Sequence, residues 1–455
     1  MDIEVENDNK NKAKSRKYKL INILLFLLFI GIFAFAFYRI NSNRTLSSRL
    51  EASRAAGYPV TFEELNQWYL MPLDEQNSAT YILNALQYYN LPNDEKLLPV
   101  IGKAELPSRT ESMNEETKEI ISQYLDSNQK CLELLHKTVG LEHGRYLADY
   151  RLGQGVPLPP LNQIQKYTIL LQLEAVYAAE NNNPDIAFKS IKSIFGVAGS
   201  LNKEPTFGSQ SNRNAFQRKA ISVLEYVINK TSLSDEQLIE LINDCEKAEL
   251  VRGILNAILG QRIMTMDMIM HPKSSYFDPV KDPVLFAFPP ILSIYKAIGI
   301  NDSDAIILLK ITDDVIKAYN LPAHQRIEAS KALDSEINSI LSKHVLLRRF
   351  APSFGRMIIL DLRNIAELRI TQTALAIERY RLANNKLPES LEEIVPDYLD
   401  SIPLDPYDGK EIRYKKLDRG FVVYSIGEDQ IDDGGKEYPR DKSDSTYDIT
   451  FIIEK

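Results

Sequence analysis

The chain has 455 residues, 44% hydrophobic and 25% charged, which is the composition of a folded protein of two or three domains and excludes wholesale disorder. Its formal net charge of -8 at pH 7 gives no electrostatic reason to expect nucleic acid as a partner. Cys131 and Cys245 lack the spacing of a zinc knuckle or a disulfide framework, so they are either one bond in an oxidising compartment or two buried free thiols.

The first element is an apolar segment at residues 20–38, in which Asn22 is the one clearly polar side chain. As a helix this segment spans roughly 28 Å, enough to cross the hydrocarbon core of a bilayer. Six basic residues precede it: Lys10, Lys12, Lys14, Arg16, Lys17 and Lys19. Because basic flanks stay in the cytoplasm, we predict a cytoplasmic tail at 1–19 and a transmembrane helix at 20–40, with the remaining chain outside the inner (plasma) membrane.

A cleaved signal peptide is the alternative interpretation of this segment. Ala34, Phe35 and Ala36 match the small-x-small pattern of a cleavage site. The apolar run is long and bulky Phe37 follows the candidate cut, so an uncleaved anchor is favoured.

Residues 41–350 are predicted to form an extracytoplasmic helical domain, because apolar residues recur with helical spacing and strand signals are scarce. Thr61 and Ser234 each begin a capping-box pattern. Residues 166–201 predict two helices separated by a polar NNNP turn, and this hairpin resembles one tetratricopeptide unit. No second copy follows at the 34-residue period, so we expect an irregular helical array.

Two proline-rich stretches, 152–162 and 271–290, are expected to be ordered loops between helices. The second carries Tyr276, Phe277, Phe286 and Phe288. These aromatics either fix the loop to the core or close it over a groove.

Residues 351–455 predict a separate α+β domain. One long amphipathic helix is followed by short alternating runs near Ile412, at GFVVYS and at YDITFII, with turn residues between them. We therefore expect a small antiparallel sheet packed on the long helix.

The order of motifs in this last domain resembles the globular part of the type II secretion major pseudopilin. The segment ALAIERYRLANNKLPESLEEIVPDYLDSIPLDPYDGKEIRY is followed by GFVVYSIGEDQIDDGG. In a pseudopilin the apolar helix stands directly ahead of this module, whereas here it lies more than 300 residues upstream. The resemblance implies the fold of the module and an envelope or secretion-associated role, without implying filament assembly.

The remainder is similar to long membrane-anchored helical proteins of planctomycetes and related bacteria. The resemblance is carried by SRLEASRAAGYPVTFEELNQWY and by LNKEPTFGSQSNRNAFQRKAISVLEYV. It implies an architecture and an envelope location, and no mechanism.

An acidic stretch at residues 425–451 is the candidate metal site. It fails as an EF-hand, because Ile431 and Arg440 stand where that loop needs oxygen ligands. The pseudopilin resemblance implies a structural calcium ion held by Ser425, Asp429 and Asp448, with Asp432 or Asp433 supplying the remaining carboxylate. The insertion KEYPRDKSD at 436–444 is longer and more basic than that pattern, and the alternative is a solvated turn without metal.

Motifs for a zinc hydrolase, a nucleotide-binding loop or a nucleophile elbow do not occur in the sequence. We therefore expect a mainly α, non-catalytic, single-pass envelope protein with protein partners. The alternative is an extracytoplasmic hydrolase with an acidic site in the cleft of the helical domain, behind the 271–290 loop.

Overall fold

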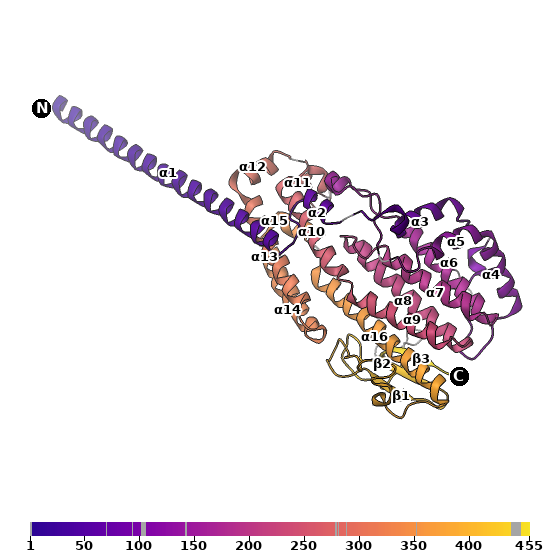
Figure 1. Cartoon of the computed structure of the whole chain (residues 1–455). Helices are drawn as coiled ribbons and strands as arrows, with labels where there is room; N and C mark the ends of the chain where they lie inside the picture. The colour runs from indigo at the N-terminus through magenta and orange to yellow at the C-terminus, as the bar shows by residue number, and fades with distance from the viewer. Residues whose placement is uncertain are drawn as a thin grey trace. The chain divides into compact units, whose positions relative to one another are not determined.

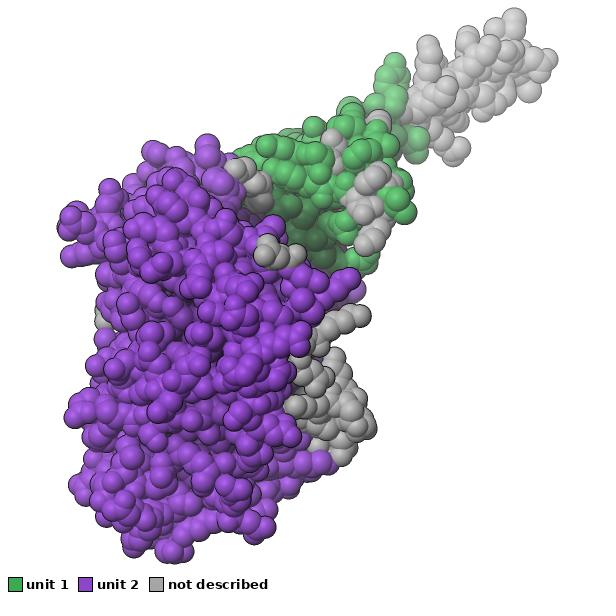
Figure 2. Space-filling model, turned by 90° about the vertical axis from the view of Figure 1, so that its right-hand side faces the viewer, with its two compact units in different colours: residues 1–58, 265–310, 344–350 green, residues 59–264, 311–343, 351–455 purple. Residues whose placement is uncertain are grey.

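The computed structural model describes residues 2–69, 71–92, 94–101, 106–141, 143–277, 280, 282–287, 289–351, 353–437 and 447–455. Helix accounts for 67% and strand for 5% of the structure, which confirms the mainly α prediction. The chain divides into two compact units (Figure 2). Unit 1 comprises residues 1–58, 265–310 and 344–350, and unit 2 comprises residues 59–264, 311–343 and 351–455.

Unit 1 contains α1 (Asp2–Ala55), an unbroken helix of 54 residues (Figure 1). Every large apolar side chain from Leu20 to Tyr38 is between 44% and 67% exposed. In the part of the chain that the structure describes, this is the one helix long and apolar enough to cross a membrane. After Tyr38, α1 buries Ser42 and Ser53.

Short helices complete unit 1. They are α11 (Pro283–Ala287), α12 (Pro290–Ile298) and α15 (Val345–Phe350), together with the end of α10 (Gly253–Met270) and the start of α13 (Ile300–Tyr319). Tyr276 and Phe277 stack on Phe350, with ring centroids 6.3 Å and 5.4 Å away. Tyr276 and Phe277 therefore fix the first part of the 271–290 stretch to a core, whereas Phe286 is exposed. Phe288 lies outside the described residues.

Among the described residues, ten α-helices lie wholly in unit 2, which also holds the main hydrophobic core and parts of α10 and α13. They are α2 (Phe62–Trp68), α3 (Ser78–Ala85), α4 (Glu115–Ser127), α5 (Gln129–His136), α6 (Leu161–Glu180), α7 (Pro184–Gly199), α8 (Phe207–Lys230), α9 (Asp235–Leu250), α14 (Ala323–Leu341) and α16 (Phe354–Asn384).

Both predicted capping boxes begin helices. The Thr61 hydroxyl accepts from the Glu64 amide at 3.2 Å at the start of α2, and Ser234 with Gln237 forms a reciprocal box at the start of α9. The predicted hairpin at 166–201 is present as α6 and α7, where Asn183 caps α7 before a proline at its first position.

Three antiparallel strands form the sheet, in the order β1 (Arg413–Lys416), β2 (Phe421–Ser425) and β3 (Ile449–Ile453). One face of β2 packs through Phe421 and Val423 into the main core with α16. The other face carries Val422 and Tyr424. Gly435 lies against these two side chains, so the acidic stretch folds over the outer face of the sheet.

The long helix α16 and the sheet share one hydrophobic core with the earlier helices of unit 2. Ile377 of α16, Val423 of β2 and Leu241 of α9 belong to the same buried cluster. Residues 351–455 thus lie within unit 2, and their independent folding as a domain stays a prediction.

Candidate functional site

The centre of the acidic region is a guanidinium. Arg413, the first residue of β1, donates to Asp405 at 2.9 Å, to Asp408 at 2.6 Å and to Asp432 at 3.0 Å. A forked guanidinium with five donors suits such convergent carboxylates. The positive charge beside Asp432 therefore comes from the protein itself, and the pKa of that carboxyl is lowered by the Gly434 amide and by Arg413, although burial opposes the shift.

Asp405 anchors this cluster from inside the protein. Its side chain is fully buried and accepts hydrogen bonds from the Ser425 hydroxyl at 2.9 Å and from the Ile426 and Tyr407 amides at 3.0 Å. The Ser425 hydroxyl is thereby directed at a carboxylate.

Asp433 and Asp448 form a second group of carboxylates in this region. Asp448 is 2% exposed and accepts from the amides of Gly435 at 2.7 Å and Asp433 at 3.4 Å. Burial raises the pKa of Asp448, and the nearby carboxylates of Asp432 and Asp433 raise it further. The Oδ2 atom of Asp433 is buried and finds no hydrogen-bond partner among the described residues.

Of the five predicted ligands, the structure thus brings Asp448 against the turn that holds Asp432 and Asp433, while the Asp432 side chain is directed at Arg413. Asp429 is exposed and accepts from the Ile431 amide at 3.1 Å. Within the described residues, no group of three or more His, Cys, Asp or Glu side chains is arranged to hold a metal ion. Most of the predicted insertion at 436–444 lies outside the described residues.

The oxygen atoms available in this turn decide whether calcium fits it. Calcium takes six to eight oxygen ligands from carboxylates, carbonyls and water. Asp433 offers one buried oxygen without a partner among the described residues, and Asp448 lies beside it with two amide contacts, whereas Ser425 and Asp432 are committed to protein partners.

Sequence reasoning missed Asp405, Asp408 and Arg413. They lie in and after the PLDPYDGK segment, where only Asp408 was interpreted, as a turn residue. The signal for Arg413 is that crowded carboxylates need a counter-charge.

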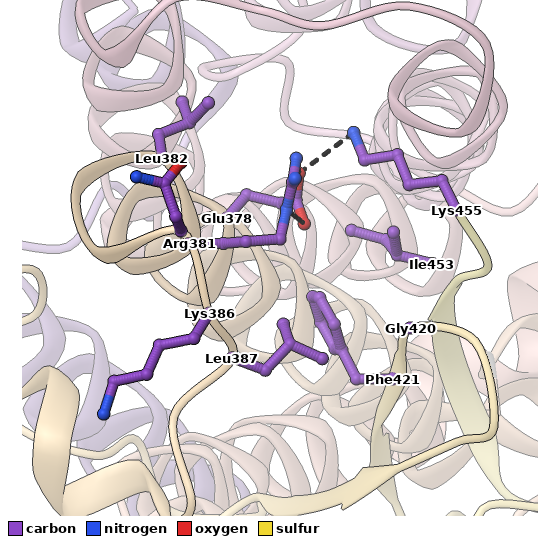
Figure 3. A pocket seen from close by; sticks show the side chains of 10 residues that line it. Glu378, Arg381, Leu382, Lys386, Leu387, Gly420, Phe421, Ile453 and Lys455 are labelled. Atoms are coloured by element: carbon purple, nitrogen blue, oxygen red, sulfur yellow. Dashed lines mark hydrogen bonds and ion pairs between the residues drawn. The ribbon is translucent and has the colours of Figure 1, made fainter.

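A pocket of about 330 Å³ lies beside the end of α16 and the strands β2 and β3 (Figure 3). Glu378 and Lys455 form an ion pair of 3.0 Å, and Arg381 donates to Glu378 at 3.0 Å and 2.8 Å. Figure 3 shows the Lys386 side chain extending away from this group. Leu387 and Phe421 supply an apolar wall.

This pocket, which we call the Glu378 pocket, offers little free charge. Both cations that face its interior are already paired with Glu378, so an incoming anion would have to displace that carboxylate. Its geometry suits stabilisation of the C-terminal strand more than capture of an anion.

Buried carboxylates occur elsewhere in unit 2. Burial raises the pKa of Glu204 to about 7, although the hydroxyls of Tyr69 and Tyr150 donate to it at 2.7 Å and 3.1 Å. Burial also raises the pKa of Glu225 to about 7, against the opposing effect of Arg109. Glu204 is fully buried, so its carboxylate is enclosed by protein.

The two cysteines are free and buried. No protein-family model, curated protein or solved structure matches this chain.

Proposed function

We propose that this protein is a non-catalytic, single-pass membrane protein that presents unit 2 outside the inner membrane as a scaffold for protein partners. The observation that carries the proposal is α1, whose large apolar residues from 20 to 38 are all exposed and whose candidate span has a mean hydropathy of 2.8 with none of it buried. Leaving that much apolar surface in water is costly, and a lipid bilayer removes the cost.

The orientation rests on charge. The basic residues between 10 and 19 precede the apolar run, so the N-terminus stays in the cytoplasm and the remaining chain is exported. A secretion-associated role is supported by the pseudopilin-like order of α16 and the three-stranded sheet.

The burial and hydrogen bonding of the acidic groups favour a scaffold over a hydrolase. An acid–base site needs carboxylates that reach a substrate. Glu204 is enclosed by tyrosines, and Asp405 is fully buried beneath Arg413, Ser425 and two amides. These contacts are those of structural groups.

Protease treatment of intact spheroplasts tests the location. The proposal predicts that the protease removes unit 2 and leaves a short fragment containing α1 in the membrane. Full protection of the chain in intact spheroplasts, with digestion after lysis, would place unit 2 in the cytoplasm and overturn the proposal. Crosslinking of the full chain in its native membrane then identifies the partners.

Calcium is the second part of the proposal: Asp433 and Asp448 hold it as a structural ion in the turn over the sheet. Isothermal titration of the full chain should show calcium binding that Asp448→Asn abolishes and that Asp429→Asn retains, because Asp429 is exposed and bonded to the Ile431 amide. The absence of calcium uptake by the unaltered protein, together with a melting temperature unchanged by chelator, would exclude a calcium site.

A further inference from the structure

Unit 1 exposes an apolar surface outside the spanning helix. In α11, Val284 is 59% and Phe286 is 42% exposed, and in α12, Ile294 is 52% and Ile298 is 45% exposed. The buried side chains of the same helices, Leu285 and Leu292, hold them to the unit.

The outward face of α12 carries apolar side chains. Residues three and four apart lie on one face of a helix, which groups Pro290, Ile294, Ala297 and Ile298. All four are exposed, whereas Leu292 is buried. Exposed Lys296 lies on the flank, where a long side chain can keep its charge in water or among lipid phosphates.

The position of α12 along α1 is set by Arg39. Arg39 is the first charged residue after the apolar run of 20–38, so a membrane crossed by that run ends near this side chain. Its guanidinium pairs with Asp302, at the start of α13. Gly299, which ends α12 with a φ of +85°, lies against the same guanidinium, and a Cβ there would come within 3.1 Å of Arg39 Cδ.

These contacts place the C-terminal end of α12 beside the residue that marks the membrane surface. We infer that the exposed apolar face of α12 (Pro290, Ile294, Ala297 and Ile298, the interfacial surface) rests in the headgroup region of the bilayer. This inference depends on the proposed membrane anchor. Amphipathic helices with exposed apolar faces bind in this way, and contiguous apolar surface beside a membrane anchor is best covered by the lipid itself.

The consequence is a second membrane contact for unit 1. A single helix leaves a domain free to rotate about the helix axis, whereas α12 on the lipid surface restricts that rotation. Lys296 adds attraction to anionic headgroups, so contact should be stronger on membranes that contain them.

Lipid quenching on the full chain in nanodiscs tests this surface. Four single-cysteine variants, Ile294→Cys, Ile298→Cys, Phe33→Cys and Ala52→Cys, are labelled with an environment-sensitive fluorophore, while native Cys131 and Cys245 are buried. Phe33 lies in the apolar run, and exposed Ala52 lies in α1 about 21 Å beyond Tyr38, at 1.5 Å of rise per residue. Doxyl-labelled phosphatidylcholine is the quencher, with and without phosphatidylglycerol.

The expected result is quenching of at least two-fold at positions 33, 294 and 298, and none at position 52. Quenching at 33 but not at 294 and 298 overturns the inference and leaves the anchor intact. A blue-shifted emission at 294 without lipid quenching also overturns it, because protein would then cover the surface. Absence of quenching at 33 refutes the membrane anchor itself.

Discussion

Asp405 and Arg413 show how a single buried charge organises the C-terminal turns. Asp405 joins the loop before β1 to the end of β2 through Ser425 and Ile426, and Arg413 extends the link to Asp408 and Asp432. A buried carboxylate is tolerated because every contact is a donor, so removing it leaves buried donors unpaired.

Asp405→Ala is therefore expected to lower the free energy of unfolding by about 3–5 kcal/mol, the range for breaking a buried ion pair by removing one partner. Chemical denaturation of the full chain in detergent measures it. Asp418→Ala is the matched control, because Asp418 is exposed, and it should change stability by less than about 0.5 kcal/mol. Equal effects of the two substitutions would show that the Asp405 contacts do not stabilise the fold.

Part of this acidic site could be predicted from the sequence. The crowding of Asp432, Asp433 and Asp448 was visible in the sequence, and the structure brings Asp448 against the turn of the other two. The need for a counter-charge follows from that crowding, but its source was not visible, since Arg413 reaches Asp432 from β1 and such a contact is a tertiary property.

Glu204 predicts a pH dependence of stability. Its folded pKa of about 7 lies above the usual 4.5, so the folded state holds a proton that the unfolded state releases between these values. Stability contributed by this group is present below pH 4.5 and is lost as the pH rises through 7. Glu204→Gln should remove that loss, on the order of 3 kcal/mol, as measured by urea denaturation at pH 5 and pH 8.

The control for this measurement is Glu95→Gln, an exposed carboxylate whose removal should leave the pH profile unchanged. Tyr69, Tyr150 and Arg145 surround Glu204 and are retained in both variants. A Glu204→Gln profile parallel to that of the unaltered protein would mean that Glu204 is ionised in the folded state at both pH values.

At the scale of elements, α10 depends on a close approach at Gly260. A Cβ at this position would overlap the carbonyl oxygen of Pro205 and come within 2.8 Å of the Pro205 Cβ. Gly260→Ala is therefore expected to destabilise unit 2 by about 1–3 kcal/mol despite the better helix propensity of alanine.

Gly208→Ala supplies the matched comparison. The nearest atom to its added Cβ is Leu161 Cδ1 at 3.9 Å, so this alanine should fit and stabilise α8 by about 0.5–1 kcal/mol. Thermal melting of the two variants should shift in opposite directions. A higher melting temperature of the Gly260→Ala variant would show that Pro205 lies farther from α10 than it does in the structure.

The elements that the sequence predicted best are those with local signals. Capping residues located the starts of α2 and α9, and the NNNP turn separated α6 from α7. The 271–290 stretch was expected to be a loop, but α11 begins at Pro283 and α12 at Pro290. Proline is excluded from the interior of a helix but is favoured in its first turn. Pro283 and Pro290 can therefore begin α11 and α12.

On the scale of the whole molecule, the fold class was predictable and the partition into units was not. Periodicity gave a mainly helical chain with a small sheet, as observed. The shared core of α8, α9, α16 and β2 joins residues that are far apart in sequence, and no local pattern reports such packing. The likeness of residues 166–201 to a tetratricopeptide hairpin and of 351–455 to a pseudopilin module stay predictions.

Retention of α1 as a membrane anchor competes directly with removal of a signal peptide after Ala36. Intact mass measurement of the protein in membranes washed with alkaline carbonate decides between them. An anchored protein should have a mass near 51.9 kDa, the mass of the full chain, in the membrane pellet. A shortened chain beginning at Phe37 and released into the wash would contradict retention of α1.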